Sequence, residues 1–371
     1  MHGRQKRGQA CDLRFSTTIN PDITRIYDNP ASGANGKGRL WESYAGGNAT
    51  AGTIVEHTKI VSYDALGKPL DQRQRFKYNN QWTEYRTQRS YNLAGAVTSQ
   101  IYPSNHSVIY NYDQAGRLGD KDSQNLAFTG NLGDNITRTY SRGISYSPFG
   151  LIAQEQFGTD TAIYNKLAYN SRGQLAEIKE STTPNDSSWN RGKFINWYSD
   201  LCGGAGCNNT NNNGNLRKQE TLIPNNEQNT SSTSWNEQYD YDSLNRLQRV
   251  HEYTGNTALD WQQEYVYDRY GNRTIHQTNT WGPASGPAIN KKDFTANVGN
   301  KNQLGVPSGQ GGTMTYDPAG NLTTDTYSAA AVTRAYDAEN RMTSETQTNN
   351  NVLGSYSYNA DGQRVRRTVA G

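Results

Sequence analysis

The sequence predicts an all-β fold of tandem β-hairpin repeats, stacked into a curved, solenoid-like sheet. Three observations support this prediction. Ten segments share one frame around a tyrosine, apolar residues alternate with polar ones on both sides of that frame, and no segment has the pattern of an amphipathic helix. Aliphatic residues are scarce, whereas the chain contains 25 Tyr and seven Trp. We therefore expect thin layers in which aromatic rings supply much of the buried apolar area.

Composition excludes several protein classes among the 371 residues. The net charge is only +3, with Lys and Arg scattered, which argues against a nucleic-acid partner. No stretch approaches the roughly 20 apolar residues of a membrane helix, so no membrane span is expected. The basic start of the chain has no apolar stretch behind it, so it does not resemble a secretory signal. Three Cys are too few for a disulfide scaffold.

The repeat is defined first by a tyrosine column. In each segment the residue after the tyrosine is Asp, Asn or Ser, as in Asp64, Asp113, Asp242, Asp268, Asp317 and Asp337. The column tyrosines are Tyr63, Tyr91, Tyr112, Tyr146, Tyr169, Tyr241, Tyr267, Tyr316, Tyr336 and Tyr358.

A second column lies four residues after each tyrosine. It holds Gly67, Gly95, Gly116, Gly150, Gly173, Gly271, Gly320 and Gly362, and Asn in the remaining two segments, Asn245 and Asn340. Gly and Asn are the residues that tolerate positive φ. Asp, Asn or Ser at the first position and Gly at the fourth is the signature of a type I turn. We therefore predict a tight hairpin with a bulge in every segment.

The flanking residues indicate one Tyr-rich and one polar face in each hairpin. Because a single hairpin cannot bury its face alone, consecutive hairpins must stack. Two degenerate copies fill the gaps between clear repeats, one with Thr210 and the other with Val298 in the tyrosine column. In these copies Gly214 and Asn302 occupy the glycine column.

The chain is predicted to have four parts. Residues 1–53 form a weakly patterned N-terminal segment, a possible degenerate repeat. Residues 54–180 are repeats. Residues 181–235 are a loop-rich Asn/Ser insertion with a degenerate repeat, and residues 236–371 are repeats again.

No catalytic, cofactor-binding or metal-binding residues are predicted. The Asp of each repeat is interpreted as a turn cap, because a carboxylate in that position accepts backbone N–H bonds. The Gly-rich run at Gly33–Gly38 lacks the preceding strand of a phosphate loop. Five residues fall at positions of a calcium-binding loop, but a single carboxylate and the absence of flanking helices argue against calcium: Asn209, Asn211, Asn213, Gly214 and Glu220.

Three further features each allow two interpretations. Cys202 and Cys207 either pair in an oxidising compartment or are two loop thiols. The basic end with Arg364, Arg366 and Arg367 is interpreted as a solvated strand face rather than an anion site. The column tyrosines pack between hairpins or stack on sugars, and we favour packing.

Several segments carry a resemblance to a known family. YNYDQAGRL, YDPAGNL, YDAENRM and YNADGQRV are similar to the YD repeats, also called RHS repeats, of bacterial polymorphic toxins, insecticidal toxin complexes and animal teneurins. The resemblance covers roughly residues 54–371. It implies a hollow shell of β-hairpins that encloses a C-terminal toxin. The RHS core and its self-cleaving aspartates would follow Gly371, so neither autoproteolysis nor toxic activity is expected of these residues.

The sequence thus supports a structural function, as a wall segment of an RHS-type shell within a longer parent protein. The expected partners are the rest of that chain, with its core and toxin domain, or a partner shell protein. The resemblance implies a protein that is secreted or lies on the bacterial cell surface. The alternative is a cell-surface carbohydrate-binding or adhesion module, in which Trp82 or Trp261 would hold the sugar.

Overall fold

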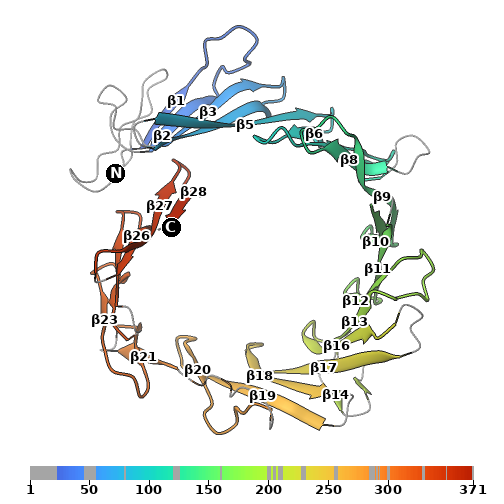
Figure 1. Cartoon of the computed structure of the whole chain (residues 1–371), viewed down its shortest axis with the longest axis vertical. Helices are drawn as coiled ribbons and strands as arrows, with labels where there is room; N and C mark the ends of the chain where they lie inside the picture. The colour runs from blue at the N-terminus through green and yellow to red at the C-terminus, as the bar shows by residue number, and fades with distance from the viewer. Residues whose placement is uncertain are drawn as a thin grey trace. The chain divides into compact units, whose positions relative to one another are not determined.

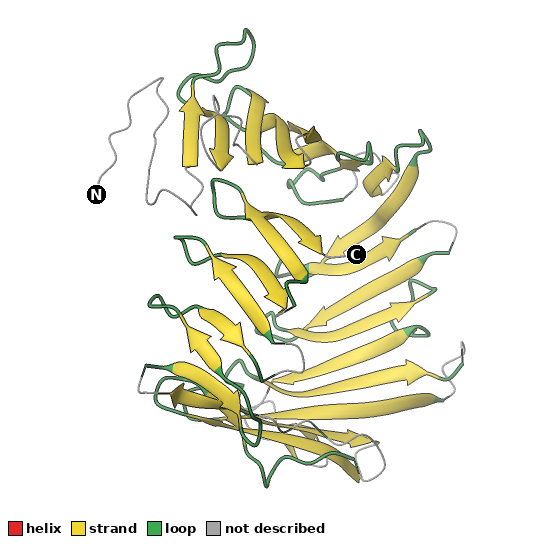
Figure 2. Cartoon of the chain, turned by 60° about the vertical axis from the view of Figure 1, so that its left-hand side comes forward, coloured by secondary structure: helices red, strands yellow, loops and turns green. Residues whose placement is uncertain are grey.

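The computed structural model describes residues 23–45, 56–78, 81–119, 126–158, 161–198, 202–203, 206–207, 212–226, 231–254, 258–283, 289, 291, 293–298, 301–327, 331–347 and 349–369. All regular structure within these ranges is β, and every strand pairing is antiparallel. Figure 2 shows these segments as strands and loops only. No helix in the described part of the chain is long and apolar enough to cross a membrane. The all-β hairpin fold predicted from the sequence is therefore confirmed.

The chain divides into two compact units. Unit 1 comprises residues 1–109, 130–136 and 309–371, and unit 2 comprises residues 110–129 and 137–308. Strands β7 (Ser107–Tyr110) and β8 (Leu126–Asn131) cross the boundaries between them.

Unit 1 contains two runs of strands, several of which are labelled in Figure 1. In the first run each strand pairs with the next, from β1 to β7. Its strands are β1 (Ile23–Tyr27), β2 (Leu40–Ala45), β3 (Glu56–Tyr63), β4 (Pro69–Tyr78), β5 (Gln81–Tyr91) and β6 (Val97–Ile101). The second run is a six-stranded sheet of β23 (Met314–Tyr316), β24 (Leu322–Asp325), β25 (Val332–Tyr336), β26 (Met342–Gln347), β27 (Val352–Tyr358) and β28 (Arg364–Val369).

Unit 2 continues the same serial pairing. Its main run is β9 (Arg138–Tyr146), β10 (Ile152–Phe157), β11 (Ile163–Tyr169), β12 (Leu175–Ser181), β13 (Gly192–Tyr198), β16 (Leu216–Pro224), β17 (Ser232–Tyr241), β18 (Leu247–Thr254), β19 (Ala258–Tyr267) and β20 (Arg273–Ile275). Two further pairs are β14 (Cys202–Gly203) with β15 (Gly206–Cys207), and β21 (Phe294–Val298) with β22 (Gln303–Pro307).

The turn that joins the two strands of a hairpin has one geometry throughout. In the turn after Tyr63, the Gly67 N–H donates to the Asp64 carbonyl at 3.1 Å and the Asp64 N–H donates to the Lys68 carbonyl at 2.9 Å. The residue in the glycine column has positive φ in all ten repeats, between 59° at Asn245 and 91° at Gly320. This conformation explains why the column holds only Gly and Asn.

The register of the hairpins shows which residues occupy the tyrosine column. Tyr241 pairs with Leu247, with a bulge beside the tyrosine, and Tyr63, Tyr91 and Tyr169 pair in the same way with the residue six positions later. In the degenerate copy, Leu216 pairs with Tyr198. Thr210, which the sequence placed in this column, lies outside the described residues. A long insertion separates Tyr198 from Gly214. Counting back four residues from that glycine therefore selected Thr210 instead of Tyr198.

The other degenerate copy keeps only part of the frame. Asn302 has a φ of 56°, as a residue of the glycine column should. Val298 pairs with Gln303, five residues later, rather than with Leu304. The turn of this copy therefore lacks the bulge position of the complete repeats.

The buried interior is small and largely polar. Among the described residues only eight hydrophobic residues are buried, and most of them are Ala or Val. Tyr63, at 5% exposure, is the one column tyrosine in this set, and the other nine are half-buried. Buried polar residues are more numerous and include Glu56, Asp71 and Lys166. The aromatic rings thus contribute apolar contact at the sheet surface rather than a thick core.

Replacing Gly116 by Val tests the turn. No atom lies within 4 Å of the position that a Cβ would occupy, so the cost comes from the backbone φ of 77° alone. We expect a loss of about 1–3 kcal/mol of unfolding free energy in urea melts. Gly311 is the matched control, because it is equally open but has no positive φ. Equal effects of Gly116→Val and Gly311→Val would contradict the assignment.

Candidate functional site

Neighbouring hairpins are linked by the hydroxyl groups of the column tyrosines. The Tyr241 hydroxyl donates to the Leu216 carbonyl at 2.8 Å, and the Tyr267 hydroxyl donates to the Leu247 carbonyl at 2.6 Å. In each case the acceptor is the residue that begins the second strand of the preceding hairpin. Tyr63, Tyr91, Tyr146, Tyr169, Tyr198, Tyr336 and Tyr358 make the same bond, at 2.5–3.1 Å. The tyrosine column therefore holds successive hairpins in register.

The aspartate after the tyrosine caps its own turn. Asp242 Oδ1 accepts hydrogen bonds from the backbone N–H groups of Leu244 and Arg246, both at 2.9 Å. Its other oxygen accepts from the Arg246 guanidinium at 2.7 Å. That guanidinium lies over the ring of Tyr267, 4.3 Å from its centroid. One arginine thus connects the cap of its own turn to the tyrosine of the next hairpin.

Two other turns repeat this connection. Arg117 bonds Asp113 and lies 4.3 Å from the Tyr146 centroid, and Arg341 bonds Asp337 and lies 4.8 Å from the Tyr358 centroid. Backbone hydrogen bonds, foremost from the Arg117 and Arg246 N–H groups, hold the pKa values of Asp113 and Asp242 below the usual range. These carboxylates are therefore ionised acceptors, as a capping function requires.

Asparagine side chains make a second kind of link between turns. Asn321 Nδ2 donates to Asn340 Oδ1 at 2.8 Å, and Asn272 Nδ2 donates to Asn302 Oδ1 at 2.6 Å. Asn215 Nδ2 and Asn245 Oδ1 form the same bond at 3.1 Å. In all three pairs the acceptor stands in the glycine column and the donor follows the glycine of the preceding turn. This coupling was not predicted, although the paired Asn positions in the sequence could have revealed it.

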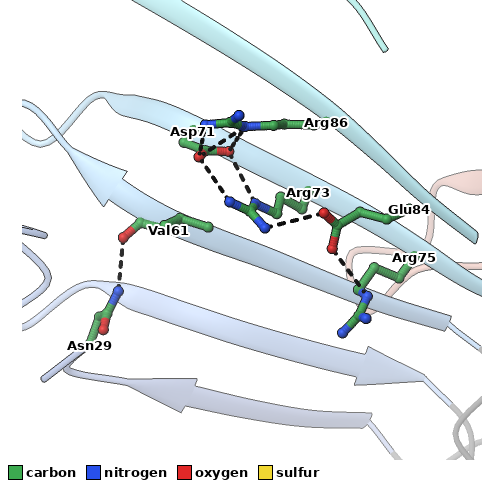
Figure 3. A network of polar contacts seen from close by, with 7 residues as sticks. All are labelled: Asn29, Val61, Asp71, Arg73, Arg75, Glu84 and Arg86. Carbon is green, nitrogen blue, oxygen red and sulfur yellow. Dashed lines mark hydrogen bonds and ion pairs between the residues drawn. The ribbon is translucent and has the colours of Figure 1, made fainter. Parts of the chain in front are cut away.

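A network of charged side chains crosses β4 and β5 on one face of unit 1 (Figure 3). Arg86 binds Asp71 with two nitrogens, at 2.8 and 3.2 Å. Arg73 contacts both Asp71 and Glu84, at 3.4 and 3.2 Å, and Arg75 contacts Glu84 at 3.2 Å. Burial alone would raise the pKa of Asp71, but the hydrogen bonds from Arg86 and Arg73 outweigh it and lower the pKa.

The same kind of network occurs on unit 2. Asp240 lies 3.0 Å from Arg217 and 3.5 Å from the ring of His251, and Arg249 contacts Glu264 at 3.1 Å. The hydrogen bond from His251 is the main reason for the lowered pKa of Asp240. Within the described ranges, no group of three or more His, Cys, Asp or Glu side chains is placed to hold a metal ion. These networks match opposite charges, which stabilises a polar sheet face.

Two buried charged residues were not predicted. Glu56 is fully buried, with Thr58 donating to its Oε1 at 3.0 Å and Gln74 donating to the same oxygen. Burial raises the pKa of Glu56 to about 7. Lys166 is 3% exposed and donates to Ser181 Oγ at 2.9 Å and to the Ser188 carbonyl at 2.7 Å. No sequence pattern distinguishes either residue from an ordinary charged strand position.

The remaining sequence candidates belong to different strands and loops. Gly38 belongs to the β1–β2 loop, where its N–H donates to Asp28. Glu220 lies within β16 and pairs with Asn236, so it does not end a ligand loop, while Asn209 and Asn211 lie outside the described residues. Cys202 and Cys207 are backbone partners across β14 and β15.

The aromatic and basic candidates are partly exposed. Trp82 is 39% exposed and contacts the ring of His57, and Trp261 is half-buried in β19. Arg364 lies over Tyr356, 5.4 Å from its centroid, and Arg366 donates to the Lys77 carbonyl at 3.3 Å.

The tyrosine link can be tested by Tyr241→Phe, which removes the hydroxyl and keeps the ring. Because the Leu216 carbonyl loses its donor, we expect about 1 kcal/mol of destabilisation in denaturant melts. Tyr85→Phe serves as the control, since the Tyr85 side chain is 46% exposed and makes no hydrogen bond within the described ranges. A loss of similar size in both variants would refute the link.

Glu56 predicts a pH dependence of stability. Its folded pKa of about 7 exceeds the ordinary 4.5, so the folded state retains a proton that the unfolded state releases. Stability should therefore fall as pH rises from 4.5 to 7 and level off above, by on the order of 2–3 kcal/mol. Glu56→Gln should flatten this slope in melts between pH 4 and 8. An unchanged slope in the variant would assign the effect to another group.

Comparison with known proteins addresses the fold. No protein-family model matches the chain, and no curated protein matches it. A chain in the crystal structure of TcdB2-TccC3-Cdc42 matches 97% of this chain with a TM-score of 0.64 and 17% identity. A chain of the Photorhabdus luminescens Tc holotoxin pore matches 98% of it with a TM-score of 0.41 and 12% identity. The present chain spans 19% and 24% of these two chains. The TM-score of 0.64 shows a shared fold, and with it the resemblance to RHS/YD-repeat proteins is confirmed at the level of the fold.

Proposed function

We propose that this chain is a wall segment of an RHS/YD-repeat shell, which encapsulates a C-terminal toxin in a longer parent protein. The observation that carries the proposal is the hydroxyl bond to the preceding hairpin that eight of the ten column tyrosines and Tyr198 make. A fold linked in this way extends by adding hairpins and does not require a closed core of its own.

The mechanism is steric containment. Continuous antiparallel pairing satisfies the backbone within each run of strands, so an enclosed chain finds few free backbone groups to pair with. Charged networks cover one face of β4–β5 and of β16–β19, which suits a wall in contact with water. The residues of this chain contribute no catalysis and need no cofactor or metal.

The proposed partners are the remainder of the longer chain or a partner shell protein, and the proposed location is secreted or at the bacterial cell surface. The similar TcdB2-TccC3-Cdc42 chain is about five times as long as the part that matches, which supports a longer parent.

The first test is the intact mass of the natural product, detected in its own cells with an antibody against residues 236–371. We expect a mass far above 41.3 kDa. In limited proteolysis of that product, the segment after residue 371 should resist cleavage until the wall is weakened by Tyr241→Phe combined with Tyr267→Phe. A product of 41.3 kDa, or a C-terminal segment cleaved at the same rate in wild type and variant, would refute containment.

A second candidate is a carbohydrate-binding surface module, which the 39% exposure of Trp82 favours. A glycan array would test it, with Trp82→Ala and Trp261→Ala as the variants. A reproducible sugar preference that is lost in either variant would support this candidate over the structural function.

A further inference from the structure

Unit 1 contains a pocket of about 610 Å³ that no sequence motif indicated. Gln74 and Phe76 of β4, Thr83 and Tyr85 of β5, and residues 365–367 of β28 line it. Because side chains alternate along a strand, Thr83 and Tyr85 lie on the face opposite to Trp82 and Glu84. The pocket is therefore separate from both the charged network of Figure 3 and the exposed Trp82.

The pocket depends on the docking of the β27–β28 hairpin against the first strands of the unit. Arg25 Nη2 donates to the Ala360 carbonyl at 2.5 Å and to Asp361 Oδ1 at 3.2 Å, and Ala360 is 4% exposed. Arg366 Nη1 donates to the Lys77 carbonyl at 3.3 Å. Two arginines thus fix the hairpin turn and β28 at the sheet.

The floor of the pocket is also held in place. Thr58 Oγ1, which also contacts Glu56, lies 2.8 Å from Gln74 Oε1, and Gln74 donates to the buried Glu56. The rings of Phe76 and Tyr85 meet edge to face, with centroids 5.9 Å apart and planes at 61°. The floor therefore presents a fixed corner of two aromatic rings rather than a slot between parallel rings.

The chemistry of the lining is cationic and aromatic. Two of the lining residues are arginines and none is acidic. The side chains of Thr83, Tyr85 and Arg367 have no hydrogen bond or ion pair within the described residues, and Tyr85 is 46% exposed. The available groups are thus one guanidinium, two hydroxyls and the face of one aromatic ring.

We propose that this pocket binds an acidic sugar, a pyranose ring that carries a carboxylate, such as a hexuronate. Arg367 pairs with the carboxylate, since a guanidinium matches that group in two-point geometry. The ring of Tyr85 packs against the C–H face of the sugar, and the hydroxyls of Thr83 and Tyr85 bond to its hydroxyls.

Other ligand classes fit these groups less well. An apolar peptide side chain would gain little burial from an open corner of two rings. A phosphate would pair with the Arg367 guanidinium but would leave the ring of Tyr85 without a partner, whereas an acidic sugar uses both. The inference does not depend on the containment function, because it concerns one pocket of unit 1 alone.

Isothermal titration of the 371-residue chain with tri-galacturonate tests the proposal. Maltotriose, a Glu-rich tripeptide and AMP serve as competing probes. We expect saturable binding of the uronate, with neutral maltotriose weaker by about tenfold or more. Arg367→Ala should lose that advantage, and Tyr85→Ala should weaken both sugars.

Tyr270→Ala is the matched control, because it removes an exposed aromatic ring that does not line the pocket. It should leave uronate binding unchanged. Thermal melts of each variant separate lost binding from lost folding, and Arg367→Lys, which keeps the charge, should retain part of the affinity. Absence of uronate binding, equal binding of maltotriose, preference for the peptide or AMP, or full binding by Arg367→Ala would each overturn the proposal. Loss of binding only in Trp82→Ala would transfer sugar recognition to the opposite face.

Discussion

The structure depends on a hydrogen bond between a tyrosine hydroxyl and a backbone carbonyl of the preceding hairpin. Few apolar side chains are buried among the described residues. Apolar burial alone therefore does little to determine which hairpin packs against which. The column tyrosine determines this packing. Its ring covers the junction, its hydroxyl satisfies one specific carbonyl, and in three turns an arginine that caps its own aspartate covers the next ring.

Polar groups take over much of the stabilisation that a core would provide. Asp71, Glu56 and Lys166 are buried but hydrogen-bonded, and the charged pairs across β4 and β5 neutralise one another. Such a sheet can have water on a face without exposing a large apolar surface. This property agrees with a wall as the proposed function, because a wall has two faces that are not hidden by further layers.

Sequence alone was sufficient for the repeat, since positive φ restricts the turn to Gly or Asn and period-two alternation identifies the strands. It failed where the spacing varied, and Thr210 was therefore chosen where Tyr198 pairs with Leu216. It also could not reveal contacts between distant segments. Arg366 meets Lys77 across 289 positions, and the pocket beside them has no local signature. Glu56 and Lys166 were missed because burial of a charged strand residue is decided by its neighbours in space.

The asparagine pairs have a consequence for how such a chain can change its length. Asn340 accepts from Asn321, and Asn302 accepts from Asn272, so each of these turns carries half of a contact that its neighbour completes. Deleting the hairpin that carries Gly271, for example, would place the Arg246 side chain where Asn302 needs an amide donor. The hairpins are consequently not interchangeable modules. The contacts between neighbouring turns depend on the serial order of the hairpins. A gain or loss of repeats would be tolerated best where both flanking turns have Gly in the glycine column.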